Sequence, residues 1–236
     1  ITLLWEVVDE RIREFPLILF SSQHSHRYVF LILIALLLMN CSNSSIDSST
    51  PTAVDETTKV IFCPQGSEIS LKTAFIYYEI DGATAEQLRD QMNQFGRKDE
   101  YGSHWDAYTD WYITWFYPYV QNADGCSTGE IEVEVEVTFE FPEWKIPANV
   151  SRDLISKWDD YLSALQKHED GHCHIAIYAA CEILQVINSL PSYPSCLNLD
   201  EAVETRTEQI LDVFREIEKD YDRDTEHGES QGVSFP

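Results

Sequence analysis

Hydrophobic and polar residues alternate most regularly between Ile131 and Phe141. Every second residue there is apolar and most positions between them are glutamates, which is typical of a half-buried antiparallel strand. The glutamates predict a solvated face, with an acidic groove for cationic substrates as the alternative. A second alternating segment, from Ala107 to Tyr119, carries aromatic and β-branched residues on both faces, which makes packing on both sides possible.

Shorter signals surround these two strands. Residues 73–82, TAFIYYEIDG, predict a strand that runs into a turn, and residues 84–95 predict a short amphipathic helix with Thr84 as its N-cap. The segment QNADGCSTGE between the two strong strands predicts a loop. Pro142 and Pro147 are expected to end the sheet region.

The period of the pattern changes after Pro147, and a long helix is expected to begin near Ser151. Steps of four and three residues join one stripe along this helix, which we expect to be buried. The stripe contains Trp158, Leu162, Leu165, Glu169, His172, Ala176, Ala179 and Ile183. A last helix, from Leu199 to about Tyr221, is expected to pack back on the first, which gives an α+β fold.

Composition and charge narrow the classes of partner. The 236 residues are 44% hydrophobic, enough for one sizeable core or a core with a small appendage. There are 16 Lys and Arg against 41 Asp and Glu, for a formal net charge of −25. Such a surface repels phosphate backbones, so no nucleic-acid partner is expected.

The beginning of the chain predicts export. Residues 28–39, YVFLILIALLLM, have the length of the apolar part of a signal peptide, and a buried core helix is the alternative. The run ends at Asn40-Cys41 and passes into a Ser/Thr-rich tether, an arrangement that resembles a bacterial lipoprotein signal with Cys41 as the lipidation candidate. We expect a periplasmic or outer-membrane lipoprotein, or an extracellular protein, that meets a membrane only through this anchor or an uncleaved signal.

Five cysteines follow Cys41, so at most two disulfides and one leftover thiol are expected among them. Cys173 and Cys181 lie eight residues apart on one predicted helix, about 12 Å along its axis, and cannot pair with each other. Cys126 and Cys196 are the preferred pair, although their spacing leaves other pairings open.

The chemistry is concentrated in LQKHEDGHCHIAIY, where His168, Glu169 and His172 have the H-E-x-x-H spacing. On a helix the two imidazoles lie one turn apart and can bind one Zn²⁺, while Glu169 can act as general base toward an activated water. The bare motif also arises by chance. Three polar side chains on a buried stripe would be unfavourable without a ligand, which favours a metal site.

A catalytic zinc site needs a third protein ligand. His174 lies on a different face of the helix from His172, and Glu182 is roughly 15 Å away along the same helix. The remaining place is the C-terminal tail, where His227 precedes Gly228 and a second glycine that let the backbone turn inward.

These residues resemble a bacterial family of predicted secreted zinc-dependent proteases that is catalogued as a domain of unknown function. The resemblance covers approximately residues 73–236 and includes WYITWFY, KWDDYLSALQKHEDGH with its H-E-x-G-H motif, the cysteine of YPSCLNL and the tail YDRDTEHGESQG. It implies that His168, His172 and His227 bind one Zn²⁺, that Glu169 is the base, and that Cys126 pairs with Cys196. Asp222 is then expected behind a ligand histidine, and Tyr221 either donates to an oxyanion or packs.

The sequence therefore predicts an exported zinc endopeptidase with a small antiparallel sheet, a long zincin-like active-site helix and a second C-terminal helix. Residues 1–41 would be an upstream extension and signal, 42–58 a tether, and 59–236 the zinc peptidase-like domain that acts on a peptide or protein substrate. Two alternatives stay open. One is an envelope binding or structural module with a closed, four-ligand structural zinc site, to which Cys173 could be added, and the other is a zinc-dependent amidase acting on cell-wall material.

Overall fold

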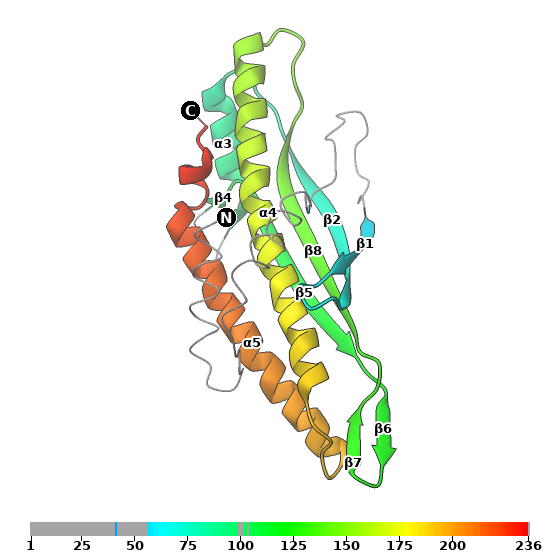
Figure 1. Ribbon diagram of the computed structural model, residues 1–236. Helices are drawn as coiled ribbons and strands as arrows, with labels where there is room; N and C mark the ends of the chain where they lie inside the picture. Colours follow the sequence, from blue (N-terminus) through cyan, green and yellow to red (C-terminus); the bar gives the residue numbers. More distant parts are fainter. Residues whose placement is uncertain (1–40, 42–55, 99–101, 103, 236) are drawn as a thin grey trace.

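The computed structural model describes residues 41, 56–98, 102 and 104–235. A sheet comes first and two long helices follow it, which confirms the α+β class (Figure 1). The predicted signal before Cys41 and residues 42–55 of the predicted tether lie outside the described residues. The strands are β1 (Thr57–Phe62), β2 (Glu68–Ile80), β3 (Arg97–Lys98), β4 (His104–Trp105), β5 (Tyr108–Phe116), β6 (Tyr119–Asn122), β7 (Gly125–Thr128) and β8 (Glu132–Trp144). The helices are α3 (Ala85–Phe95), α4 (Arg152–Ser189), α5 (Cys196–Thr225) and the 3₁₀ turn η1 (Glu229–Gln231).

The main sheet has four strands in the order β1-β2-β8-β5. β5 pairs antiparallel with β8 as expected, but β2 pairs with β8 in parallel, so the sheet is mixed. The alternation of β8 is confirmed: Val135 and Phe139 are fully buried under α4, whereas Glu132 and Glu136 lie on the opposite, solvated face. The sheet thus presents one apolar face to the long helix.

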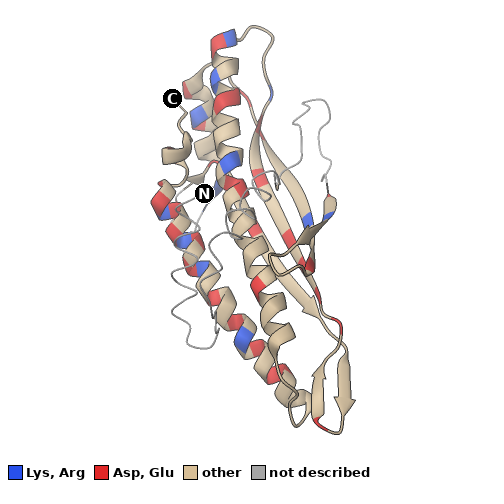
Figure 2. Cartoon of the chain, in the orientation of Figure 1, with Lys and Arg blue, Asp and Glu red and all other residues tan. Residues whose placement is uncertain are grey.

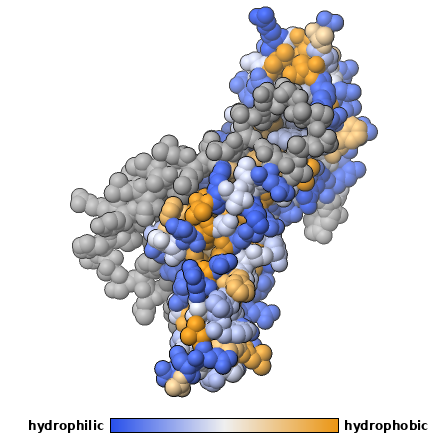
Figure 3. Space-filling model, turned by 90° about the vertical axis from the view of Figure 1, so that its right-hand side faces the viewer, coloured by the Kyte–Doolittle hydropathy of each residue, from blue (hydrophilic) through white to orange (hydrophobic). Residues whose placement is uncertain are grey.

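Only one face of β5 is packed against the helices, although the sequence made packing on both sides possible. Thr109 and Ile113 are buried toward the helices, but Tyr112 and Phe116 on the other face are 66% and 63% exposed. Within the described part of the chain no helix covers this outer face, because the long helices lie on the inner side of the sheet (Figure 1). Figure 3 shows it as hydrophobic patches scattered among hydrophilic ones. The glutamates of β8 lie on this solvated face, as the sequence favours, and the cavity described below lies on the helix side of the sheet.

Two boundaries of the sheet also differ from the expectation. The segment predicted as a loop forms the hairpin β6–β7, whose tip is stabilised by Asn122 Oδ1 accepting from the Asp124 amide at 2.8 Å. Pro142 does not end β8, which continues to Trp144 and pairs with β2. β5 no longer pairs with β8 beyond Glu140, so one side of β8 is free there and a proline is tolerated.

Helices α3 and α4 begin where the sequence predicts, whereas α5 begins at Cys196, three residues before the predicted Leu199. Thr84 Oγ1 caps α3 and Ser151 Oγ caps α4, each accepting from a backbone amide in the first turn at 3.2 Å. The predicted stripe of α4 is buried apart from Leu162, which is half-buried. Figure 1 shows α4 lying between the sheet and α5, and Figure 2 shows that acidic residues outnumber basic ones along α5. No helix in the described ranges is long and apolar enough to cross a membrane.

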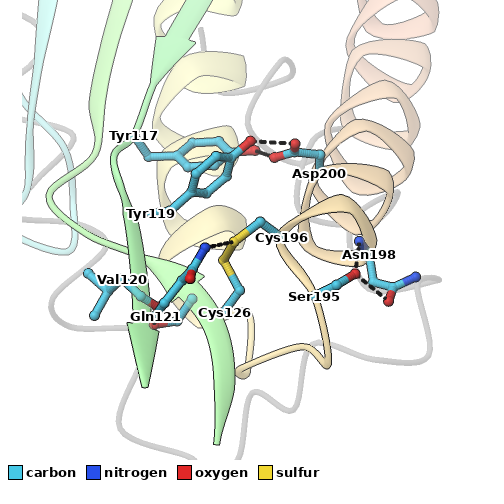
Figure 4. Close-up of a disulfide and its surroundings, with 10 residues drawn as sticks. Tyr117, Tyr119, Val120, Gln121, Cys126, Ser195, Cys196, Asn198 and Asp200 are labelled. Atoms are coloured by element: carbon cyan, nitrogen blue, oxygen red, sulfur yellow. Dashed lines mark hydrogen bonds between the residues drawn. A yellow bond between two sulfur atoms is a disulfide. The ribbon is translucent and has the colours of Figure 1, made fainter. Parts of the chain in front are cut away.

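Three disulfides tie the layers together. Cys126 bonds to Cys196, the pair that the family resemblance implies, and fastens the β6–β7 hairpin to the start of α5 (Figure 4). Next to it, Tyr117 and Tyr119 both donate to the carboxylate of Asp200, at 2.7 and 2.5 Å. This end of the molecule is therefore held by a covalent bond and two charge-assisted hydrogen bonds.

The other two disulfides correct the cysteine prediction. Cys63 bonds to Cys181, and Cys173 bonds to Cys41, so no described thiol is left over. A sulfur in a disulfide is not free to carry a lipid thioether, and the structure therefore does not support Cys41 as a lipidation site. Three disulfides are typical of a protein that folds in an oxidising compartment.

Candidate metal centre

The H-E-x-x-H motif lies in the middle of α4, away from both ends of the helix. His168, Glu169 and His172 are only 4%, 4% and 7% exposed, so all three chemical groups are withdrawn from bulk water. The rings of the two histidines have centroids 5.0 Å apart, as expected for residues one turn apart on one face. A central position in a long, capped helix makes this geometry rigid.

Helix α5 supplies the third group. Asp222 Oδ1 lies 3.3 Å from His168 Nε2 and 3.1 Å from His172 Nε2. These three residues form a group whose ligand atoms all lie within 4.8 Å of one another and which could hold a metal ion. Two imidazole nitrogens and one carboxylate oxygen are a donor set that suits a divalent transition metal. Asp222 was expected as a partner of a ligand histidine on the side away from the metal, but its carboxylate faces the Nε2 atoms of both histidines.

The outer nitrogen of each histidine is also held. His172 Nδ1 lies 2.7 Å from Glu218 Oε2, and His168 Nδ1 lies 3.2 Å from Gln231 Oε1. With each Nδ1 donating to its oxygen partner, a metal ion that replaces the Nε2 protons would find both Nε2 lone pairs on the side of Asp222. These two contacts thus orient the two imidazole rings so that both could bind the same metal ion.

The close contacts between these ionisable groups shift their pKa values. Burial acts to lower the pKa of His172, but hydrogen bonds with Asp222 and Glu218 outweigh it and hold the pKa well above its ordinary value. Burial acts to raise the pKa of Asp222, but hydrogen bonds with His168 and His172 hold it below the usual range. The aspartate is therefore ionised at neutral pH, as a metal ligand must be.

Glu169 lies on the same buried face of α4, and its carboxylate is bound by a residue of the sheet. Thr109 Oγ1 on β5 donates to Glu169 Oε2 at 2.7 Å. Burial raises the pKa of Glu169, and the neighbouring His172 and His168 and the hydrogen bond from Thr109 oppose this only in part. A carboxylate with a raised pKa beside a metal group is better suited to accept and return a proton than one with an ordinary pKa.

Close packing of Tyr221 on α4 explains the glycine of the motif. The Tyr221 ring stacks on His168 with centroids 5.0 Å apart, and its hydroxyl donates to the His168 carbonyl at 3.0 Å. A Cβ at Gly171 would lie 2.1 Å from that hydroxyl oxygen, so no larger residue fits. Tyr221 therefore packs and positions His168, and its hydroxyl is already engaged with the backbone.

His227 lies beside the group rather than in it. Its side chain is 50% exposed, its ring packs on Trp105 at a centroid distance of 4.4 Å, and its Nδ1 is 3.8 Å from Asp222 Oδ1. Glu226 and His227 have φ angles of 52° and 51°, in the left-handed region that non-glycine residues rarely adopt. The chain is thus turned sharply after α5 so that this histidine lines the cavity described next.

A cavity of about 590 Å³ opens beside the metal group. Its wall includes the motif residues, Asp222, His227, Trp105 and Tyr108. Elsewhere on the wall the Arg89 guanidinium donates to both oxygens of Asp106, at 2.9 and 2.6 Å, and Tyr161 donates to the same carboxylate. The cavity gives a substrate direct access to Glu169.

Sequence reasoning missed Thr109, Glu218 and Gln231. Glu218 had a signal, because it precedes Asp222 by four residues and so shares its helical face. Thr109 and Gln231 are brought in from a strand and from η1, and nothing local in the sequence marks them. Cys173 and His174, which directly follow the motif, are not in the metal group.

Comparisons with known proteins agree with the bacterial origin that the resemblance implied. No curated protein and no solved structure matches the chain. A family model described as a bacterial protein of unknown function, DUF922, matches residues 75–228, which include the histidines of the motif, Glu218 and Asp222. The chain therefore belongs to the bacterial family DUF922.

Proposed function

We propose that the protein is a zinc-dependent endopeptidase that acts outside the cytoplasm. The observation that carries the proposal is the juxtaposition, at one wall of a cavity, of a His-His-Asp group and a buried glutamate with a raised pKa. The donor set favours zinc, since two imidazoles and a carboxylate with an open position are common in zinc hydrolases. The three disulfides support an exported location.

In this proposal His168, His172 and Asp222 hold the ion, and His227 lies at the edge of the cavity. A bound zinc would supply a Lewis acid that polarises the substrate carbonyl and lowers the pKa of water. Glu169 takes the proton from the attacking water at its carboxylate and passes it to the leaving amine. Thr109 holds Glu169 in the orientation that this transfer needs.

The alternative of a closed structural zinc site loses its fourth ligand. Cys173 was the residue considered as an added ligand of such a site, and its sulfur is bonded to Cys41. A structural site is also closed to solvent, whereas this group borders a cavity of about 590 Å³. Hydrolysis of a non-peptide amide would use the same residues and differs only in the substrate.

The test replaces Glu169 by glutamine, which keeps the size of the side chain and removes its basicity. Glu169→Gln should bind one zinc per chain as the wild type does and should lower peptide hydrolysis by at least about a hundredfold. Glu182→Gln is the matched control, because Glu182 is the other glutamate of α4 and does not line the cavity. Unchanged hydrolysis by Glu169→Gln would sink the proposal.

A further inference from the structure

The wall of the metal cavity is strongly acidic. The carboxylates on it are Asp106, Glu169, Glu218, Asp222, Glu226 and Glu229. Within the described part of the chain, Arg89 is the single lysine or arginine of the lining, and it is already paired with Asp106. A divalent metal would offset two of the five remaining charges, so a negative potential persists inside the loaded cavity.

Two atoms on the same wall lack a partner. Glu218 Oε1 and His104 Nδ1 are the buried side-chain nitrogen or oxygen atoms of the described residues for which no hydrogen bond exists. Both residues line the cavity, and the other oxygen of Glu218 is occupied by His172. A carboxylate oxygen can only accept, so Glu218 Oε1 is available to a donor from a bound molecule.

The acids lie at two depths. Glu218 is only 20% exposed at the wall, whereas Glu226 and Glu229 are exposed and follow α5 at the mouth. A long side chain with a cationic end could pass the two outer glutamates while its donor reaches inward. The net charge of −25 over the whole chain would attract such a molecule from solution.

We propose that the cavity selects peptides with a lysine or arginine next to the scissile bond, and that Glu218, Glu226 and Glu229 bind that side chain. The inference rests on the proposed peptidase function and adds its substrate class. Glu226 and Glu229 belong to neither the metal group nor the proton transfer, so they can be changed without removing the chemistry.

Binding to the zinc-loaded Glu169→Gln protein tests the inference apart from cleavage. Fluorescent peptides of one sequence, with lysine, glutamine or glutamate at one central position, are titrated at about 0.05 M and 0.5 M salt. The lysine peptide should bind about tenfold more tightly than the glutamine peptide at low salt, the glutamate peptide most weakly, and the difference should shrink at high salt. Equal affinities, or no binding of any peptide, would overturn the inference.

A charge-matched pair of variants tests the residues. Adding Glu226→Gln and Glu229→Gln should reduce the preference for lysine at least about threefold. Adding Glu204→Gln and Glu208→Gln, which removes two charges from exposed positions of α5 outside the cavity, should leave it unchanged. An equal loss of lysine preference in both variants would refute the assignment of the binding site to Glu226 and Glu229 at the mouth of the cavity.

Hydrolysis of the same peptides by the wild type distinguishes failure of the peptidase proposal from failure of the charge selection. If lysine peptides bind with this preference and none is cleaved with zinc bound, the peptidase proposal fails and the charge selection stands. If peptides are cleaved at equal kcat/KM whatever the charge of the central residue, the peptidase proposal stands and this inference fails.

Discussion

Gly171 offers a quantitative test of how α5 positions the motif. Gly171→Ala would place a methyl group 2.1 Å from the Tyr221 hydroxyl oxygen and 2.3 Å from the ring carbon that bears it, so the ring must move. Overpacking of this kind costs about 1–3 kcal/mol, and losing the hydrogen bond to the His168 carbonyl costs about 1 kcal/mol more. Alanine favours the helix by about 1 kcal/mol over glycine, which leaves a net loss of about 2 kcal/mol in the free energy of unfolding.

Urea unfolding of the metal-free protein, with its disulfides intact, measures this loss through the fluorescence of its six tryptophans. The control is the same substitution in a Tyr221→Leu background, where the ring is absent. There Gly171→Ala should be neutral or stabilising by up to about 1 kcal/mol, so that the two sites couple by about 2–3 kcal/mol. A similar effect of Gly171→Ala in both backgrounds, or no destabilisation in the wild type, would refute the reasoning.

Three further predictions test other parts of the account. Asp222→Ala should weaken zinc binding at least about a hundredfold in a competition assay with a chelating dye, and His227→Ala by no more than about tenfold; the reverse order would make His227 the ligand. Gln231→Ala should weaken zinc binding about tenfold because His168 Nδ1 loses its partner, whereas Ser230→Ala, next to it on η1, should not. Cys196→Ser opens a disulfide between residues 70 apart in sequence and should lower the free energy of unfolding by about 4 kcal/mol, and an unchanged urea midpoint would contradict this.

Regular patterns made much of the fold predictable. The period of two in β8 and the steps of four and three in α4 each identify a buried face, and the caps Thr84 and Ser151 locate the helix starts. The direction of strand pairing was not predictable in this way. β2 shows the same alternation whether it lies parallel or antiparallel to β8, because pairing depends on distant contacts.

The candidate site likewise has a part that follows from local sequence and a part that depends on distant contacts. His168, Glu169 and His172 are one local motif, and their burial follows from the stripe of α4. The third group depends on how α5 crosses α4, which decides whether Asp222 or His227 points at the two imidazoles. The cysteine prediction failed at Cys41 for a similar reason, since residues 132 apart in sequence meet only in the folded chain.

The central claim is that zinc bound by this group makes the protein a peptidase. The most direct measurement is a titration of the metal-stripped wild type with zinc while hydrolysis of a mixed peptide library is followed. Activity should be absent without metal, rise in proportion to added zinc and level off at one equivalent per chain, with Glu169→Gln inactive throughout. Hydrolysis that is unaffected by stripping the metal, or no hydrolysis at any zinc level, would contradict the account.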